Sequence, residues 1–366
     1  MKLAIIGASS GQLPLCLKAK EMGLETICFA WAKGAICKDF VDRYYPISIA
    51  DKDNISLICK EEKIDGIVSN ASDATAEVVS YIATALGLHG IDHQSFLGIM
   101  DKARVRSLVH GIKDLADVPF TIDTCSVPFS FPYVIKPRTG ASKKGVYYVE
   151  DADECEEALS YIRNQLGAEA LIEQFVTGRE ISVETLSFEG EHHVLQITDK
   201  VNGGPPHFVE LAHHQPALLS DELRERIVAI VPHILDAVSY RNGASHVELK
   251  VDSESNIRLV EINPRGGGDE ISSKLVELST GYDYIKGMIE VSLGHFLKPK
   301  KKWNMSAGIY YLCKQSEAWL PAFTSSTDPS WLIEKEVELE SGLRLASGNY
   351  DRNGYLIYQS ERKIIL

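Results

Sequence analysis

The sequence predicts a protein of several domains in which a parallel α/β unit precedes an α+β unit. Three observations predict this fold class. Within residues 1–95, short apolar runs alternate with amphipathic helical patterns, which is typical of a parallel sheet with helices on both faces. Between residues 246 and 268, two arms of alternating apolar and polar residues flank a polar turn, which indicates a β-hairpin. At 366 residues, the chain is long enough for two or three domains with buried cores.

The composition is typical of a globular protein whose partners are small molecules. Apolar residues make up 45% of the chain and charged residues 24%, which argues against extensive disorder. The formal charge of −13 disfavours binding to nucleic acid or to an anionic membrane, because both need a cationic face. Any phosphate-binding site must therefore be local. The basic run at residues 298–302 is interpreted as a solvated linker.

The cysteines and the N-terminal residues favour a cytoplasmic location. The seven cysteines are scattered, odd in number and without a Cys-x-x-Cys pair, so we expect reduced thiols. The chain enters a strand pattern at residues 3–6 without the layout of a signal peptide. It also contains no uninterrupted apolar span of about 20 residues, so no membrane helix is predicted.

In the first unit, strands are predicted at residues 2–6, 26–29 and 66–69, and helices at residues 13–22, 55–62 and 74–86. The first turn, residues 7–12, follows a strand and opens a helix, so a dinucleotide site has to be considered. The turn lacks the Gly-x-Gly-x-x-Gly spacing, and no acid at a strand end follows about 20 residues later. We therefore expect a tight turn, whose N–H groups can contact another ligand.

The second unit is predicted to contain a hairpin that carries a flexible flap, residues 137–145. A helix from Asp101 to about residue 112 precedes it, and prolines at 119, 128 and 132 mark the boundary. Strands are predicted at residues 133–136, 146–149, 170–175 and 181–188, with a helix at residues 151–165. Farther along, a strand ends at residues 198–200, helices span residues 221–240 and 282–293, and short strands follow at residues 308–313, 334–339 and 356–359.

The hairpin at residues 246–263 carries the strongest functional signal. If residues 253–256 form its loop, Glu248 faces Glu261 and His246 faces Asn263. Facing positions lie roughly 5 Å apart, and like charges there are destabilising unless something neutralises them. A divalent cation would do so, and carboxylate and carboxamide oxygens suit Mg²⁺ completed by nucleotide phosphates.

Arg265 and three glycines follow the hairpin directly. The arginine offers a fixed positive fork, and the glycines offer unhindered N–H groups for an anion. The alternative is an ordinary hairpin with solvated acids and a Gly-rich turn, because facing acids can also splay outward.

Two further segments suggest a nucleotide site. The flap combines glycines, a serine and lysines, and its N–H groups can cradle phosphates, although it is not a P-loop. A mobile surface hairpin explains the flap about as well. The strand at residues 171–176 breaks at Gly178, which can expose one N–H and one C=O for the edge of adenine, and Glu180 could accept from ribose hydroxyls. The alternative is a strand end with a solvated acid.

The order of these motifs resembles the ATP-grasp superfamily, which contains carboxylate–amine ligases and their carboxylase and carbamoyl phosphate relatives. The resemblance covers about residues 1–300, and residues 197–200 and 210–217 look most like the L-amino acid ligase branch. It implies the ATP-grasp fold with a Rossmann-like N-terminal domain at residues 1–100. An ATP-grasp domain would follow at residues 101–300, with a lid subdomain at about 118–178, and a small, mainly β domain at residues 301–366.

The resemblance also implies the roles of individual residues. Those implied to bind ATP are Lys102, Lys136, Ser142, Gly145, Glu173, Gln174, Phe175, Val176 and Glu180. The implied metal ligands are Glu248, Glu261 and Asn263, and the implied catalytic residues are Arg265, Lys200, His213 and His214. The implied substrate-binding residues are Gly266, Gly267 and Gly268. Either histidine could instead be a satisfied loop residue, because a candidate base without geometry is weak evidence.

The implied activity is an ADP-forming carbon–nitrogen ligase that uses ATP and one or two Mg²⁺ ions, with Mn²⁺ as a substitute. Such an enzyme phosphorylates a carboxylate and joins the acyl phosphate to an amine, and we expect a homodimer. The alternatives are a regulatory ATP-binding protein and a carboxylase-like enzyme. The intact set of Glu248, Glu261, Asn263 and Arg265 speaks against the first. The absence of a biotin-accepting lysine in a Met-Lys-Met context speaks against the second.

Overall fold

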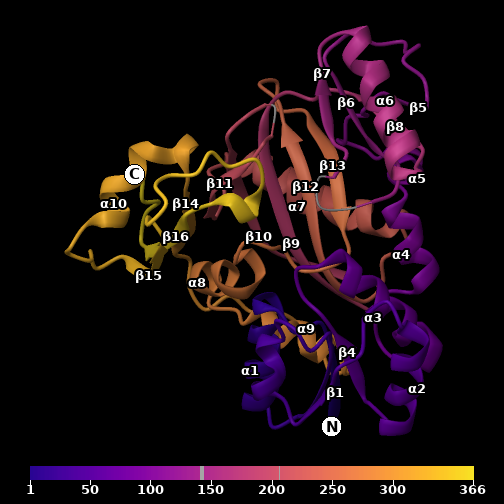
Figure 1. The fold of residues 1–366 in the computed structure, drawn as a ribbon, viewed down its shortest axis with the longest axis vertical. Helices are drawn as coiled ribbons and strands as arrows, with labels where there is room; N and C mark the ends of the chain where they lie inside the picture. Colours follow the sequence, from indigo (N-terminus) through magenta and orange to yellow (C-terminus); the bar gives the residue numbers. More distant parts are fainter. Residues whose placement is uncertain (141–143, 206) are drawn as a thin grey trace.

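The computed structural model describes residues 1–140, 144–205 and 207–366, which contain three β-sheets. Figure 1 shows a parallel α/β unit (indigo) at one end of the molecule and a small antiparallel sheet with α6 at the other. A long central sheet lies between them, and its C-terminal strands (yellow) extend to one side (Figure 1). The architecture is the ATP-grasp fold.

The N-terminal unit is a parallel sheet, as predicted, and it has four strands where three were predicted. Its strands β1 (Lys2–Ile6), β2 (Glu25–Phe29), β3 (Arg43–Tyr45) and β4 (Gly66–Val68) lie in the order β3-β2-β1-β4. Helix α1 (Leu13–Glu21) connects β1 to β2, α2 (Lys52–Glu62) connects β3 to β4, and α3 (Asp73–Leu86) follows β4. Leu3 and Ile5 enter one apolar cluster and Ala4 and Ile6 another, so both faces of the sheet are buried.

The helices α4 (His93–Met100) and α5 (Lys102–Val109) lead to the small antiparallel sheet. Its strands β5 (Phe120–Ile122), β6 (Tyr133–Pro137), β7 (Tyr147–Val149) and β8 (Ala170–Gln174) lie in the order β5-β8-β6-β7, with α6 (Ala152–Leu166) packed against them. Cys125 and Cys155 form a disulfide here. The expectation that all seven cysteines are reduced is therefore wrong for this pair, which the fold brings together across 30 residues of sequence.

The central sheet has eight strands in the order β13-β12-β9-β10-β11-β14-β16-β15. They are β9 (Arg179–Phe188), β10 (Glu191–Asn202), β11 (Glu210–Gln215), β12 (Gly243–Val251), β13 (Ile257–Asn263), β14 (Ser306–Leu312), β15 (Leu332–Val337) and β16 (Gly354–Ser360). Because β14 pairs with β11, the C-terminal strands continue the central sheet.

Alternating residues along β9, β10 and β12 give this part of the central sheet an apolar face and a polar face. The apolar face, with Val183, Ile197 and Val247, packs on α7 (Asp221–Ala237). The polar face carries the charged residues of the candidate site. The remaining helical segments are a π-helical turn (Ile271–Leu275), α8 (Val276–Thr280), α9 (Tyr284–Ser292) and α10 (Leu320–Thr324), with short 3₁₀ turns at Ser10–Gln12, Ile36–Phe40, Lys314–Trp319 and Asn349–Asp351.

Helix α9 joins the N-terminal unit to the central sheet. Its residues Tyr284 and Ile289 share one buried cluster with Leu3 of β1 and Leu186 of β9. The two units therefore have a common core at this junction. In the described parts of the chain, no helix has the length and apolar character needed to span a bilayer.

The packing of α7 on the sheet generates a stability prediction. Ile234 is fully buried, so Ile234→Ala should lower the free energy of unfolding by about 2–5 kcal/mol through lost burial and the cavity left behind. Val228 lies on the same helix but is 41% exposed, so Val228→Ala should cost within about 0.5 kcal/mol. Urea unfolding of both variants measures this difference, and equal losses would contradict the assigned buried face of α7.

Candidate active site

The two acids of the hairpin face each other. Glu248 pairs with Glu261 and His246 pairs with Asn263, which confirms the predicted register. The loop differs from the prediction. Five residues, 252–256, separate the two strands, whereas a loop of four residues, 253–256, was predicted. A bulge at Val260 absorbs the extra residue, since Glu248 pairs with Glu261 but Leu249 pairs with Leu259.

Arg106 of α5 holds the bulge in place. Its Nη2 donates to the carbonyl oxygen of Val260 at 2.8 Å, and its Nε donates to Glu173 Oε1 at 2.6 Å. The carboxylate of Glu173 also accepts from Lys136 Nζ at 2.7 Å. Burial raises the pKa of Glu173, but Arg106 and Lys136 outweigh it and lower this pKa to about 2. The lysine expected to bind phosphate is therefore fixed by a buried, ionised partner.

Cations from other positions neutralise both facing acids. Lys102 Nζ lies 3.1 Å from Glu261 Oε1, and Lys200 Nζ lies 3.2 Å from Glu248 Oε1. His246 Nε2 lies 3.1 Å from the same oxygen of Glu248. Lys102 also donates to the carbonyl oxygen of Gly140 at 2.7 Å, which ties the start of the flap to Glu261. The repulsion expected between facing acids is thus compensated by side chains.

The donor set fits Mg²⁺ that is shared with a nucleotide. Glu248, Glu261 and Asn263 offer carboxylate and carboxamide oxygens on neighbouring strand positions. Within the part of the chain that the structure describes, no group of three or more His, Cys, Asp or Glu is arranged to hold a metal by itself. Mg²⁺ usually takes one or two carboxylates and completes its shell with water and phosphate. The three side chains would therefore need the phosphates of a nucleotide.

Lys200 is the centre of a buried network of acids. Its Nζ lies 3.0 Å from Glu180 Oε1, 3.3 Å from Glu210 Oε1 and 3.2 Å from Glu248 Oε1. Burial lowers the pKa of Lys200, but Glu210, Glu248 and Glu180 together raise it well above its ordinary value. The lysine therefore stays charged.

Glu210 was not among the residues predicted for the site. Its neighbour Leu211 forms a bulge, since Val201 pairs with Ala212 but Asn202 pairs with Glu210. The bulge returns Glu210 to the face that carries Lys200, whereas alternation along β11 would have put it on the other face. Sequence periodicity gives no signal for this.

The hinge after β8 lies between the small sheet and the central sheet. Lys250 Nζ donates to the carbonyl oxygen of Val176 at 3.0 Å and lies 4.8 Å from the ring centroid of Phe175. The ring of Phe175 meets that of Tyr148 edge to face at 4.9 Å. The next residue before Phe175, Gln174, is the exposed end of β8. The hinge is therefore fixed on both sides, with main-chain groups of residues 174–176 at the junction.

The flap is described only in part. Ser142, predicted to bind ATP, lies outside the described residues. Gly145 has φ +76°, and a Cβ there would lie 2.7 Å from Leu166 Cδ1. A side chain at this position would be strained by the backbone conformation, and Leu166 would have to shift to make room for it.

The turn after the hairpin orients Arg265. Its Nε donates to Asp73 Oδ1 at 2.7 Å, its Nη2 to Asn263 Oδ1 at 3.3 Å and its Nη1 to the carbonyl oxygen of Gly266 at 3.1 Å. A Cβ on Gly267 would lie 2.8 Å from His246 Nδ1. The N–H of Gly267 donates to Glu184 Oε2 at 3.2 Å, whereas Gly268 faces open space.

Strand β11 separates the two predicted histidines. His213 pairs with Lys200 and shares its face of the sheet, and its Nε2 lies 3.4 Å from Asp269 Oδ2. Its Nδ1 is buried without a hydrogen-bond partner among the described residues. His214 lies on the opposite face, where its Nδ1 is 3.0 Å from the hydroxyl of Tyr358 and burial lowers its pKa to about 3. The structure therefore brings His213 to the other candidates but not His214.

Asp269 is a second site residue that the sequence patterns did not reveal. Its carboxylate accepts from Arg352 Nη2 at 2.7 Å and from Asn349 Nδ2 at 3.1 Å, in addition to its contact with His213. Burial raises the pKa of Asp269, but the bonds from His213 and Arg352 outweigh it and hold this pKa well below its usual range. The C-terminal segment thus reaches the polar face of the sheet.

Comparison with known proteins identifies the domain and its relatives. Residues 129–274 match the model of the ATP-grasp domain. The chain is 27% identical over 320 residues to the uncharacterized protein y4rH of Sinorhizobium fredii, and the match covers 82% of this chain and 65% of that protein. It is 31% identical over 176 residues to carnosine synthase 1 of Homo sapiens, over 44% of this chain and 21% of that protein. The matches thus span 65% and 21% of the lengths of these two curated relatives.

A solved structure supports the same fold. The L-amino acid ligase from Bacillus licheniformis superposes with a TM-score of 0.77 at 24% identity, over 99% of this chain and 93% of that one. At this level of identity the likeness concerns the fold.

The environment of His214 predicts a pH dependence of stability. Burial lowers the pKa of His214 from 6.5 to about 3. Above pH 6.5 the histidine is therefore neutral in the folded and the unfolded state, and its ionisation does not change the free energy of unfolding. Between pH 6.5 and 3 the unfolded state binds a proton that the folded state does not, which lowers the free energy of unfolding by up to about 1.4 kcal/mol per pH unit. His214→Gln removes this term, so its stability should fall less steeply upon acidification.

Urea unfolding between pH 8 and 4 measures the effect. His295 is exposed, so His295→Gln should keep the slope of the unmodified protein. A His214→Gln slope equal to that of the unmodified protein would show that His214 is not a buried neutral histidine.

Proposed function

The chain is an ATP-grasp domain protein, and on this premise we propose that it is an ATP-dependent carboxylate–amine ligase. The enzyme phosphorylates a carboxylate to an acyl phosphate and joins it to an amine, with release of ADP and phosphate. The observation that carries the proposal is the pairing of Glu248 with Glu261. Asn263 follows two residues after Glu261 and accepts a hydrogen bond from Arg265. Binding of a nucleotide without phosphoryl transfer would not require all four.

Positioning and charge stabilisation account for most of the mechanism, because phosphoryl transfer leaves little covalent chemistry to the protein. Lys136, held by Glu173, and Lys102, held beside Glu261, bind the phosphates of ATP. Glu248, Glu261 and Asn263 would hold Mg²⁺, which would neutralise the charge on those phosphates. Adenine is bound by main-chain groups of residues 174–176 other than the N–H groups of Gln174 and Phe175, which already donate to Pro119 and Pro132. The carboxylate of Glu173 is engaged with Lys136 and Arg106.

The later steps use residues on the polar face of the sheet. Arg265 donates to the transferring phosphoryl group and then to the oxyanion that forms when the amine attacks. His213 accepts the proton of the amine at Nδ1, because Asp269 accepts from Nε2 and holds the ring in that tautomer. Lys200 keeps Glu180, Glu210 and Glu248 in place. His214 has no role in the reaction.

The names of the relatives support an amino acid as one substrate. A carnosine synthase is among the sequence relatives and an L-amino acid ligase among the solved structures. We accordingly propose that the carboxylate, the amine or both come from amino acids. The homodimer, the cytoplasmic location and the domain boundaries stay predictions.

Removal of a metal ligand tests the proposed metal site. Glu261→Ala should abolish Mg²⁺-dependent release of ADP while leaving the fold intact, because it removes a ligand and no core volume. Exposed Glu254 in the loop of the same hairpin provides the matched control, Glu254→Ala, which should retain activity. ADP release and thermal unfolding are measured for both. Near-normal turnover of Glu261→Ala would exclude Glu261 from metal binding.

Trapping of the intermediate tests the reaction class. With ATP, Mg²⁺ and the correct carboxylate, hydroxylamine in place of the amine should yield a hydroxamate, because this small nucleophile reaches the activated carbonyl. Amino acids are screened first, followed by hydroxy acids and dicarboxylates. Accumulation of AMP and pyrophosphate without hydroxamate would show adenylation in place of phosphorylation. Absence of carboxylate-dependent ADP release across the panel would favour a regulatory ATP-binding protein.

Replacement of Arg265 separates binding from turnover. Arg265→Lys keeps a positive charge but loses the planar fork. We expect ATP binding to survive better than turnover, with a loss of roughly 10²-fold in kcat if the arginine contacts the transition state. Isothermal titration with a nonhydrolysable ATP analogue and the hydroxamate assay measure the two quantities. Parallel loss of both would assign Arg265 to nucleotide binding alone.

A further inference from the structure

The arginine of the site is held by a residue of the N-terminal unit. Asp73, the first residue of α3, accepts from Arg265 Nε at 2.7 Å and from its Nη2 at 3.5 Å. The two residues lie 192 positions apart in sequence. Their side chains are only 12% and 16% exposed, so the pair is shielded from most solvent screening. The attraction between the two side chains is therefore screened less than that of an exposed pair.

The contact belongs to a docked surface. In the loop before α3, Asn70 Oδ1 accepts from Ser272 Oγ at 3.1 Å. A Cβ on Gly266 would lie 2.4 Å from the same oxygen, so the glycine allows the loop to approach the turn. The segment at residues 70–73 thus meets the turn at two adjacent points, Asp73 at Arg265 and Asn70 at Gly266. These contacts fix Asp73 relative to Arg265.

Asp73 also opposes the electrostatic attraction between Arg265 and the two acids proposed to bind the metal. Glu248 and Glu261 both attract Arg265 electrostatically. With Asp73 in place, the Nε edge of the guanidinium is directed toward the carboxylate at the start of α3. Without it, Arg265 would keep its bonds to Asn263 and to the carbonyl oxygen of Gly266, and the attraction from Glu248 and Glu261 would have no opposing carboxylate. Arg265 would then turn toward the carboxylates that the metal needs.

We propose that Asp73 is a positioning residue that holds Arg265 in its working orientation and keeps it off Glu248 and Glu261. The proposal rests on the proposed function, in which Arg265 contacts the transferring group. It adds that the N-terminal unit contributes to turnover through this one carboxylate, without contact between Asp73 and the reacting atoms.

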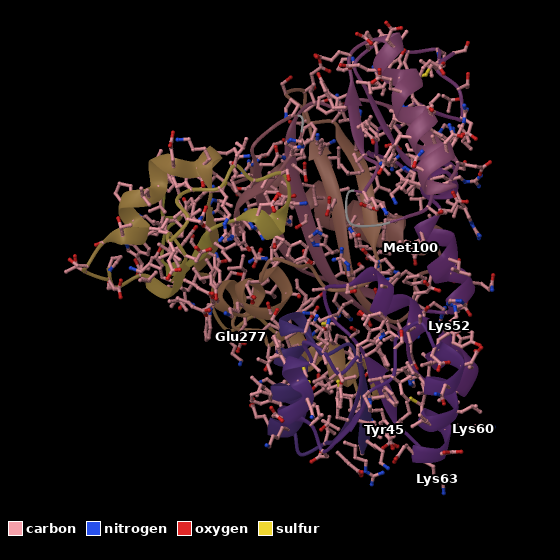
Figure 2. All side chains as sticks on the ribbon, in the orientation of Figure 1. Tyr45, Lys52, Lys60, Lys63, Met100 and Glu277 are labelled. Atoms are coloured by element: carbon pink, nitrogen blue, oxygen red, sulfur yellow. A yellow bond between two sulfur atoms is a disulfide. The ribbon has the colours of Figure 1, made fainter. Side chains whose placement is uncertain are left out.

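Kinetics of Asp73→Asn provide the first test. The neutral side chain keeps the shape but loses the charge that orients Arg265, so kcat should fall on the order of 10²-fold. The KM for ATP should change little, and the Mg²⁺ concentration for half-maximal rate should rise, because Arg265 then competes for Glu248 and Glu261. Asp73→Glu retains the carboxylate and should recover most of the rate. The matched control is Glu77→Gln on the same helix. Its partner in an ion pair is half-buried Lys52, which lies at the outer edge of the N-terminal unit (Figure 2).

A double-mutant cycle shows whether Asp73 acts through Arg265. If it does, adding Asp73→Asn to the Arg265→Lys variant should lower kcat further by less than about 2-fold. Losses that multiply would overturn the proposal, as would an unchanged kcat for Asp73→Asn. Thermal unfolding monitors the fold of every variant. If Asp73→Asn does not fold, Asp73→Ser is measured in its place, because serine is well tolerated at the start of a helix.

A spectroscopic readout keeps this test separate from the proposed function. In ¹H–¹⁵N spectra of arginine side chains, the Nε–H signal of Arg265 is identified by its loss in Arg265→Lys. It should exchange slowly with water in the unmodified protein and in Asp73→Glu, and rapidly in Asp73→Asn. Rapid exchange in the unmodified protein would overturn the proposed positioning. A protein without ligase activity in which this signal is protected would contradict the proposed function and leave the contact with Asp73 intact.

Discussion

The repulsion between Glu248 and Glu261 is the constraint on which the rest of the site depends. The register of β12 and β13 fixes the two glutamates at facing positions on the same face of the sheet. Each is compensated by a cation from outside the facing pair, Lys102 from α5 for Glu261 and Lys200 from β10 for Glu248. The surrounding elements therefore converge on the hairpin with positive charge. This is also the arrangement that binding of a nucleotide phosphate beside these acids requires.

The sequence predicted the parts of the fold that rest on strong periodicity. The parallel N-terminal strands, the helix α6 and the hairpin all follow from alternation or helical spacing over many residues. Strand β3 was not predicted, because it lies at the edge of the sheet and its residues Arg43–Tyr45 form no buried apolar run. The pairing of Glu248 with Glu261 was predicted on the assumption of a four-residue loop, but the loop has five residues. Val260 restores the register, and nothing in its apolar side chain distinguishes a bulged residue from a regular one.

The residues that sequence reasoning missed depend on contacts between distant segments. The bulge at Leu211 brings Glu210 to Lys200, and Asp269 acquires its role from Arg352, 83 positions later. The same limit explains the histidines. Adjacent residues in a strand face opposite sides, so at most one of His213 and His214 could share the face of Lys200, but the choice depends on pairing with β10. The disulfide between Cys125 and Cys155 likewise follows from packing of α6 and has no motif.

Three arginines join the hairpin and its turn to the surrounding units. Arg106 ties the bulge in β13 to the hinge at Glu173, Arg265 ties the turn to Asp73 of the N-terminal unit, and Arg352 ties the C-terminal segment to Asp269. Buried ion pairs of this kind add little net stability, because desolvation offsets much of their attraction. Their planar forks instead fix orientation. A movement of any one unit would therefore shift a guanidinium that contacts the hairpin or its turn.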